Sequence, residues 1–70
     1  MPADEARFEE YDVVALTEPR PDVDLDAGVW GTVLRAIDGE YEVEFTEQDG
    51  TPIAVRLVPG HVLRLVWAEP

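Results

Sequence analysis

The chain has 70 residues, enough for one small domain and too few for two hydrophobic cores. Its 16 acidic and 5 basic residues give a formal net charge of −11, which argues against binding to nucleic acids or to anionic membranes. Because there is no cysteine, neither a disulfide nor a thiolate metal site can stabilise the fold. The sequence shows no membrane-spanning apolar run and no signal peptide, so we expect a cytoplasmic protein.

The N-terminal region divides into a polar arm and the start of a β domain. Residues 1–10 are polar and acidic, with Phe8 as their only aromatic residue, and predict a flexible or weakly ordered arm, or a single helical turn. A single domain is expected over residues 11–70. Its first strand is predicted at residues 12–17, a β-branched run that two nearby prolines then end.

The central region predicts a loop followed by a hairpin. Residues 22–26 alternate acidic and apolar side chains, so Val23 and Leu25 can face inward while the acidic ones face water. A second strand is predicted at 29–37 and a third at 40–45, joined by the two-residue turn Asp38-Gly39, whose composition favours type I′ geometry. The third strand alternates strictly, and its predicted inward residues are Tyr41, Val43 and Phe45.

The C-terminal region predicts two further strands. After a turn at Asp49-Gly50, a fourth strand is expected at 52–58, and a fifth at 62–67 follows a tight corner at 59–61. By alternation, the predicted inward residues of the fourth strand are Ile53, Val55 and Leu57.

Five short strands with tight turns predict an all-β fold whose edges must be protected. A small five-stranded SH3-like barrel is the most economical solution, with the proline-rich stretch as its first long loop and the 59–61 corner as a 3₁₀ turn. An OB-type barrel is the alternative, but it usually needs more residues and a helix.

The hairpin turn also predicts the register of three strands. A two-residue turn places Arg35 opposite Glu42. If Phe45 lies opposite Ile53, Glu42 also lies opposite Arg56. We therefore predict a structural cross-strand charge set on the outer face, consisting of Arg35, Glu42 and Arg56.

The residue types give no support for catalysis. The chain has no Ser, Cys or Lys to act as a nucleophile and a single histidine, His61, so we expect no enzyme and no cofactor. The Asp22-x-Asp24-x-Asp26 spacing resembles the start of a calcium loop, but Ala27 and Val33 stand where that loop needs Gly and Glu, so we expect no metal site.

A run of one charge sign gives the main functional prediction. Residues 38–49 carry six acids and no base, and such a density steers basic partners toward a surface. We expect a protein partner with a basic surface, no nucleic acid and no membrane. The predicted partner-binding residues are Glu40, Glu44, Glu47 and Asp49, with a second patch at Asp22, Asp24 and Asp26. Trp30 and Trp67 are expected in the core rather than at this surface, since the core is small.

The spacing of the fixed points resembles a family of small bacterial proteins, domain of unknown function 4926. The resemblance covers about residues 8–65 and depends on segments 11–16, 25–33 and 41–45 and on the Asp49-Gly50 turn. It implies an SH3-like barrel and no catalytic residues. Some members of that family lie beside toxin-like genes, which implies an antitoxin or immunity role.

We therefore predict a non-enzymatic acidic protein-interaction module, in its concrete form an antitoxin or immunity protein that masks a basic partner surface. One alternative is an accessory subunit of a larger enzyme or electron-transfer complex, with an exposed apolar patch around Val62, Val66 and Trp67. A third is an SH3-type peptide receptor, whose groove would need Tyr11, Trp30 and Trp67.

Overall fold

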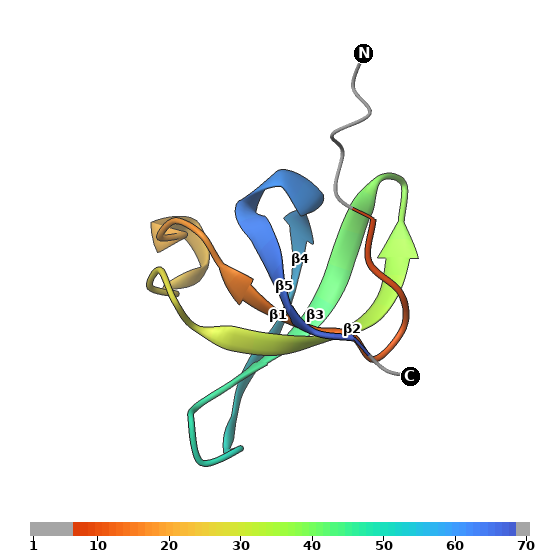
Figure 1. Ribbon diagram of the computed structural model, residues 1–70. Coiled ribbons are helices and arrows are strands. Elements are labelled where there is room, and N and C mark those ends of the chain that lie inside the picture. Colours follow the sequence, from red (N-terminus) through yellow and green to blue (C-terminus); the bar gives the residue numbers. More distant parts are fainter. Residues whose placement is uncertain (1–6, 69–70) are drawn as a thin grey trace.

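The computed structural model describes residues 7–68 and contains five strands and two 3₁₀ turns (Figure 1). The expected strands are all present, and each strand end lies within one residue of its predicted position. The elements are β1 (Val13–Leu16), η2 (Pro21–Val23), β2 (Trp30–Ile37), β3 (Glu40–Thr46), β4 (Pro52–Pro59), η3 (Gly60–Val62) and β5 (Leu63–Trp67).

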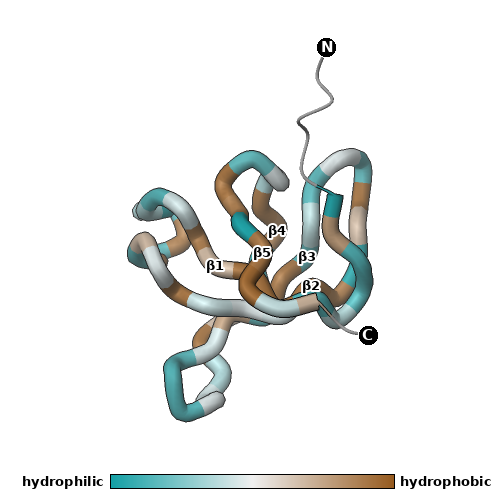
Figure 2. Tube along the Cα trace, in the orientation of Figure 1, coloured by the Kyte–Doolittle hydropathy of each residue, from teal (hydrophilic) through white to brown (hydrophobic). Residues whose placement is uncertain are grey.

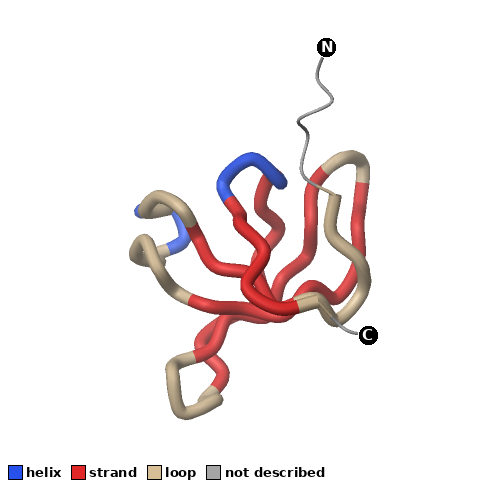
Figure 3. The backbone as a smooth tube through the Cα atoms, in the orientation of Figure 1, coloured by secondary structure: helices blue, strands red, loops and turns tan. Residues whose placement is uncertain are grey.

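The strands form one antiparallel sheet in the order β4-β3-β2-β1-β5. The sheet curls strongly, so that β1 and β5 lie against the concave side of the β2–β3–β4 part (Figure 1). The loops and both 3₁₀ turns lie at the strand ends, with η3 between β4 and β5 (Figure 3). This is the predicted all-β, SH3-like architecture.

The β2–β3 hairpin follows the predicted register. Asp38 and Gly39 both have positive φ, 51° and 84°, as a type I′ turn requires. Arg35 lies opposite Glu42, and its Nε donates to Glu42 Oε1 over 2.9 Å. The register shift in β2 lies between Val33 and Arg35 rather than at Gly31.

The β3–β4 pairing is one residue out of the predicted register. Phe45 lies opposite Ala54, and Glu42 lies opposite Leu57 rather than Arg56. Arg56 pairs with Val43 instead, and its Nη1 donates to the Val55 carbonyl oxygen over 2.8 Å. The prediction that Arg56 completes a charge set with Glu42 was therefore wrong.

The same shift turns the expected core residues of β4 outward. Opposite residues of an antiparallel pair share a face of the sheet. Val55 and Leu57 therefore lie on the outer face, and Val58 on the inner face beside Tyr41. The prediction for the fourth strand was wrong, since Ile53, Val55 and Leu57 are 43%, 43% and 45% exposed.

Packing around Phe45 gives the physical reason for this register. Phe45 is fully buried, and its two cross-strand neighbours are the small residues Gly31 and Ala54. A Cβ on Gly31 would lie 2.5 Å from Val43 Cγ1 and 3.0 Å from Phe45 Cδ1, so no side chain fits there. The aromatic ring fills the space that its small neighbours leave, and the bulkier residues of β4 face outward.

The core lies between the two halves of the curled sheet, and hydrophilic residues gather in the loops (Figure 2). Leu25, from the long β1–β2 loop, belongs to this core, as the alternation of residues 22–26 predicted. The prediction that the two tryptophans are buried was wrong, because Trp30 is 51% and Trp67 52% exposed. The buried set is Val14, Leu16, Leu25, Val33, Tyr41, Val43, Phe45, Val58, Val62 and Leu63.

The residues just before the first strand pack on the barrel. Phe8 contacts Tyr41 edge-to-face at a centroid distance of 5.2 Å, and its backbone N–H donates to the Tyr41 hydroxyl. The buried side chain of Asp12 accepts a hydrogen bond from the Glu9 N–H at 2.9 Å. The packed unit thus begins before Tyr11, and residues 1–6 of the predicted arm lie outside the described residues.

Candidate functional site

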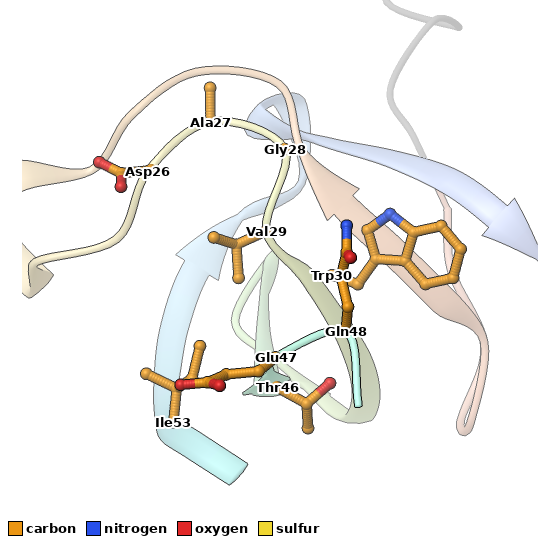
Figure 4. Close-up of a pocket in the computed structure, with 9 residues that line it drawn as sticks. All are labelled: Asp26, Ala27, Gly28, Val29, Trp30, Thr46, Glu47, Gln48 and Ile53. Carbon is orange, nitrogen blue, oxygen red and sulfur yellow. The ribbon is translucent and has the colours of Figure 1, made fainter. Parts of the chain in front are cut away.

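A pocket of about 370 Å³ lies between the end of the β1–β2 loop and the β3–β4 turn (Figure 4). Most of the residues that line it are exposed, so it opens directly onto the surface. Its lining residues are Asp26, Ala27, Gly28, Val29, Trp30, Thr46, Glu47, Gln48 and Ile53.

Backbone hydrogen bonds give the β1–β2 loop its shape. Arg20 and Leu25 exchange two backbone hydrogen bonds. The Arg20 N–H donates to the Leu25 carbonyl oxygen at 2.8 Å, and the Leu25 N–H donates to the Arg20 carbonyl oxygen at 3.1 Å. Gly28, at φ 90°, donates to the Leu16 carbonyl oxygen over 2.9 Å and brings the chain back to the sheet. Buried Leu25 anchors the loop, and Asp26 follows it at the pocket wall.

The β3–β4 turn forms the opposite wall and is held by a compact set of hydrogen bonds. The Glu47 N–H donates to the Thr51 carbonyl oxygen, and the Gly50 N–H donates back to Glu47. The Thr51 N–H donates to Asp49 Oδ1 over 2.9 Å. Hydrogen bonds from the Thr51 side chain and backbone lower the pKa of the Asp49 carboxyl below its ordinary value of 3.8. Asp49 therefore stabilises the turn that presents Glu47.

The pocket combines acidic and apolar walls. Asp26 and Glu47 are its two charged lining residues, and neither carboxylate has an ion-pair or hydrogen-bond partner among residues 7–68. In Figure 4 both carboxylates lie on one side of Val29, together with Ile53, and the Trp30 indole lies on the other with Gln48. Such walls suit a ligand that is both cationic and partly apolar.

The structure brings the two predicted acidic patches together only in part. Asp26 from the first loop and Glu47 from the turn share the pocket, and Asp49 lies in the same turn as Glu47. Asp22 instead pairs with Arg20 at 3.3 Å, which offsets its charge. Asp24 is exposed with φ 62° and does not line the pocket.

The remaining predicted acids lie away from the pocket along β3. Glu44 is half-buried on the outer face between Thr32 and Val55. Glu40 begins β3 next to the β2–β3 turn, and a strand of seven residues spans about 20 Å. The acidic run 38–49 is thus spread over both ends of one strand and does not form a single patch.

The sequence prediction missed the apolar part of the pocket. Trp30 was expected in the core, although the strand alternation could have placed it correctly. Gly31 and Val33 are buried, so Trp30 and Thr32 must lie on the outer face of the same strand. Ile53 was missed for a different reason, because the register of β4 depends on packing around Phe45.

Other kinds of site find less support in the described residues. No group of three His, Asp or Glu side chains within residues 7–68 could hold a metal ion. Trp30 is the single aromatic residue of the pocket, so Tyr11 and Trp67 do not join it in one groove there. Neither 3₁₀ turn, nor any other helix in the part of the chain described, has the length and hydrophobicity to cross a membrane.

Comparison with known proteins gives a family. The family model described as Domain of unknown function (DUF4926) matches residues 10–65, a range that includes all nine lining residues of the pocket. No curated protein and no solved structure matches the chain.

Proposed function

The chain belongs to the family described as Domain of unknown function (DUF4926), and from that premise we propose that it is a non-enzymatic protein-interaction module for a basic partner. The observation that carries the proposal is the meeting of two acidic loops at one pocket, with Asp26 and Glu47 unpaired and no cation among the lining residues.

Electrostatics supports this role. With a net charge of −11, the surface attracts basic proteins and raises their rate of association. At physiological ionic strength the Debye length is about 8 Å, so charges clustered in neighbouring loops act together on a docking surface. An antitoxin or immunity protein that covers a basic nuclease-type site in the cytoplasm is the concrete form of this proposal.

Charge reversal at the acidic surface tests the proposal. The immobilised chain is used to capture proteins from an extract of its own host, and the captured proteins are identified. Basic proteins that elute with rising salt are expected, and Asp26→Lys with Glu47→Lys should abolish their capture. The matched control reverses Glu10 and Glu18, which are also exposed acids but do not line the pocket. Capture that survives the Asp26 and Glu47 reversal at low salt would refute the proposed surface.

A second candidate function is that of an accessory subunit in a larger complex, and the outer face of β4 favours it. Ile53, Val55 and Leu57 are each more than two-fifths exposed on an edge strand. The patch expected around Val62, Val66 and Trp67 is less suitable, because Val62 is fully buried. Sizing the purified protein with a hydrophobic dye decides this candidate: a persistent monomer that binds no dye would speak against a missing large interface.

A further inference from the structure

We propose that the free edge of β4 binds an extended segment of the basic partner, which pairs with Val55 and Leu57 as an additional strand of the sheet. This inference rests on the proposed function, which it deepens by naming the form in which the partner is recognised. β4 is an edge strand and pairs with β3 alone among residues 7–68 (Figure 1).

Backbone hydrogen bonds across the sheet show which way the polar groups of each strand point. The N–H and C=O of one residue point to the same side of a strand, and consecutive residues alternate. The backbone groups of Val33 bond to Asp12 and Tyr11, the residues that lead into β1. Those of Thr32 therefore point toward β3, where Glu44 is its partner. Glu44 points back toward β2, so the next residue on β3 points toward β4.

The same alternation directs the backbone groups of Val55 and Leu57 to the free edge. Val43 points toward β4, and its partner Arg56 points back toward β3. The two neighbours of Arg56 therefore direct their N–H and C=O groups away from the sheet. An independent contact agrees, because the exposed Arg56 side chain donates from Nη1 to the Val55 carbonyl oxygen over 2.8 Å. Within residues 7–68, no other hydrogen bond reaches the edge-facing groups of these two residues.

The side chains of the same two residues favour a strand as the occupant. Val55 and Leu57 are both exposed on the outer face, beside their unpaired backbone groups. Edge strands are usually protected by charges or prolines, and between Pro52 and Pro59 this strand has only Arg56. An added strand would pair with the backbone groups and bury both apolar side chains under its own. Main-chain bonds then supply affinity, and the apolar contacts supply specificity.

Charge complementarity selects the kind of strand. On the outer face, the neighbours of Val55 and Leu57 on β3 are both glutamates. Glu42 bonds to Arg35, whereas half-buried Glu44 has no ion pair within the described part of the chain. An added strand lies about 10 Å from β3, comparable to the Debye length of about 8 Å at physiological ionic strength. A segment that combines basic and apolar residues therefore fits this edge, whereas a second copy, also at −11, is repelled.

Hydrogen exchange with a designed strand tests the proposal. The probe is acetyl-Lys-Lys-Val-Thr-Val-Thr-Val-Lys-Lys-amide, added to ¹⁵N-labelled protein. Without peptide, the amides of Val55 and Leu57 should exchange fast and that of Arg56 slowly, because only the last lies within the sheet. At a peptide concentration ten times the dissociation constant, exchange at Val55 and Leu57 should slow about tenfold, and Arg56 should not change.

Two matched peptides separate main-chain pairing from charge attraction. The same sequence, N-methylated at its five central residues, keeps the charge but has no donor for the β4 carbonyl groups. It should not slow exchange at Val55 or Leu57. The sequence with glutamate at all four lysine positions keeps the donors but reverses the charge, and it should bind about tenfold more weakly or less.

Variants at the edge should act with opposite signs. Glu44→Gln should weaken the basic peptide about two- to fivefold. Arg56→Ala should strengthen it by a similar factor, because it removes a donor from the Val55 carbonyl oxygen and a positive charge from the edge. Val55→Pro removes an edge-facing N–H and should abolish binding. The matched control is Leu65→Thr, which changes a similarly exposed leucine on the opposite edge strand and should leave binding unchanged. If Val55→Pro does not fold, the N-methylated peptide makes the same test on the unmodified protein.

Each remaining outcome decides between the alternatives. Unchanged exchange at Val55 and Leu57, equal binding of either matched peptide, or protection that grows with protein concentration without peptide would overturn the strand site; the last result would assign the edge to a second copy. If the peptide fails while a basic host partner is captured and lost on reversal of Asp26 and Glu47, the inference falls and the proposed function stands. If the peptide binds as expected and no basic partner is captured, the edge binds strands and the proposed function falls.

Discussion

The two hairpins that share β3 obey different rules. The β2–β3 hairpin has a two-residue turn with both φ values positive, and its pairing follows from the turn alone. The β3–β4 hairpin has a five-residue connection between its strands and a register shift next to Phe45. Its apolar alternation points the wrong way, because the residues that alternate most clearly, Val55 and Leu57, face outward.

A two-residue turn therefore determines the register of its two strands locally, whereas after a longer connection the register depends on packing in the core. In the β3–β4 hairpin the register is set by Phe45 and by the small residues Gly31 and Ala54 on either side of it. The pocket is a consequence of that choice, because the same shift places Ile53 at its wall.

The largest expected effect comes from removing the ring that sets the second register. Phe45→Ala deletes a fully buried side chain and should cost about 3–5 kcal/mol of unfolding free energy, measured by urea denaturation. This loss approaches the whole stability of a small domain, so the milder Phe45→Leu should also be measured.

The matched control for Phe45 lies on the outer face of the same hairpin. Leu57→Thr should change the unfolding free energy by no more than about 0.5 kcal/mol, because Leu57 is 45% exposed. A core-sized cost at Leu57 would contradict the observed register and restore the predicted one.

A smaller effect is expected where the sheet leaves no room for a side chain. Gly31→Ala puts a Cβ 2.5 Å from Val43 Cγ1 and 3.0 Å from the backbone oxygen of Glu44. The resulting overpacking should cost about 1–3 kcal/mol in the same denaturation experiment. Stability equal to that of the unmodified protein would show that the row around Phe45 is not tightly packed.

Double-mutant cycles on Glu42 compare its two predicted partners, Arg35 in the first hairpin and Arg56 in the second. Arg35→Ala, Glu42→Gln and the double variant should give a coupling free energy of about 0.2–1 kcal/mol, because the two charged groups are 2.9 Å apart and partly exposed. The same cycle with Arg56 in place of Arg35 should give no coupling, because Arg56 lies opposite Val43. Equal couplings would favour the three-residue charge set that the sequence predicted.

The smallest expected effect concerns the turn of the second hairpin. Thr51→Val removes the hydroxyl that helps to lower the pKa of Asp49, so that pKa should rise toward 3.8 in an NMR titration of the carboxyl group. Because the folded pKa lies below the ordinary value, Asp49 stabilises the native state above pH 3.8, and this contribution disappears as the pH falls through the folded pKa. An unchanged titration in the variant would mean that the backbone N–H of Thr51 alone is responsible.

Several features could be predicted from the sequence because they depend on local chemistry. The Asp38-Gly39 turn, the alternation of β3 and the burial of Leu25 all follow from neighbouring residues. The resemblance to the family was confirmed by the match over residues 10–65.

The features that could not be predicted depend on contacts between distant segments. The apolar side chains of β4 face outward because of the packing of Phe45 against Gly31, two residues that lie on other strands. The pocket joins residue 26 to residue 47, and nothing in either acidic patch indicates the other. The acidic residues at 38–49 are close in sequence, but the extended strand β3 separates those at its two ends in space.

The many acidic residues also have a consequence at the free edge of β4, where they oppose the pairing of one copy of the chain with another. This strand exposes Ile53, Val55 and Leu57 and has only Pro52, Pro59 and Arg56 to discourage pairing with another copy. At neutral pH mutual repulsion keeps the molecules dispersed, whereas acidification reduces the net negative charge and with it the repulsion. Acidification is then expected to convert the solution into β-rich aggregates seeded along this edge, so that the negative charge works as a safeguard against self-assembly.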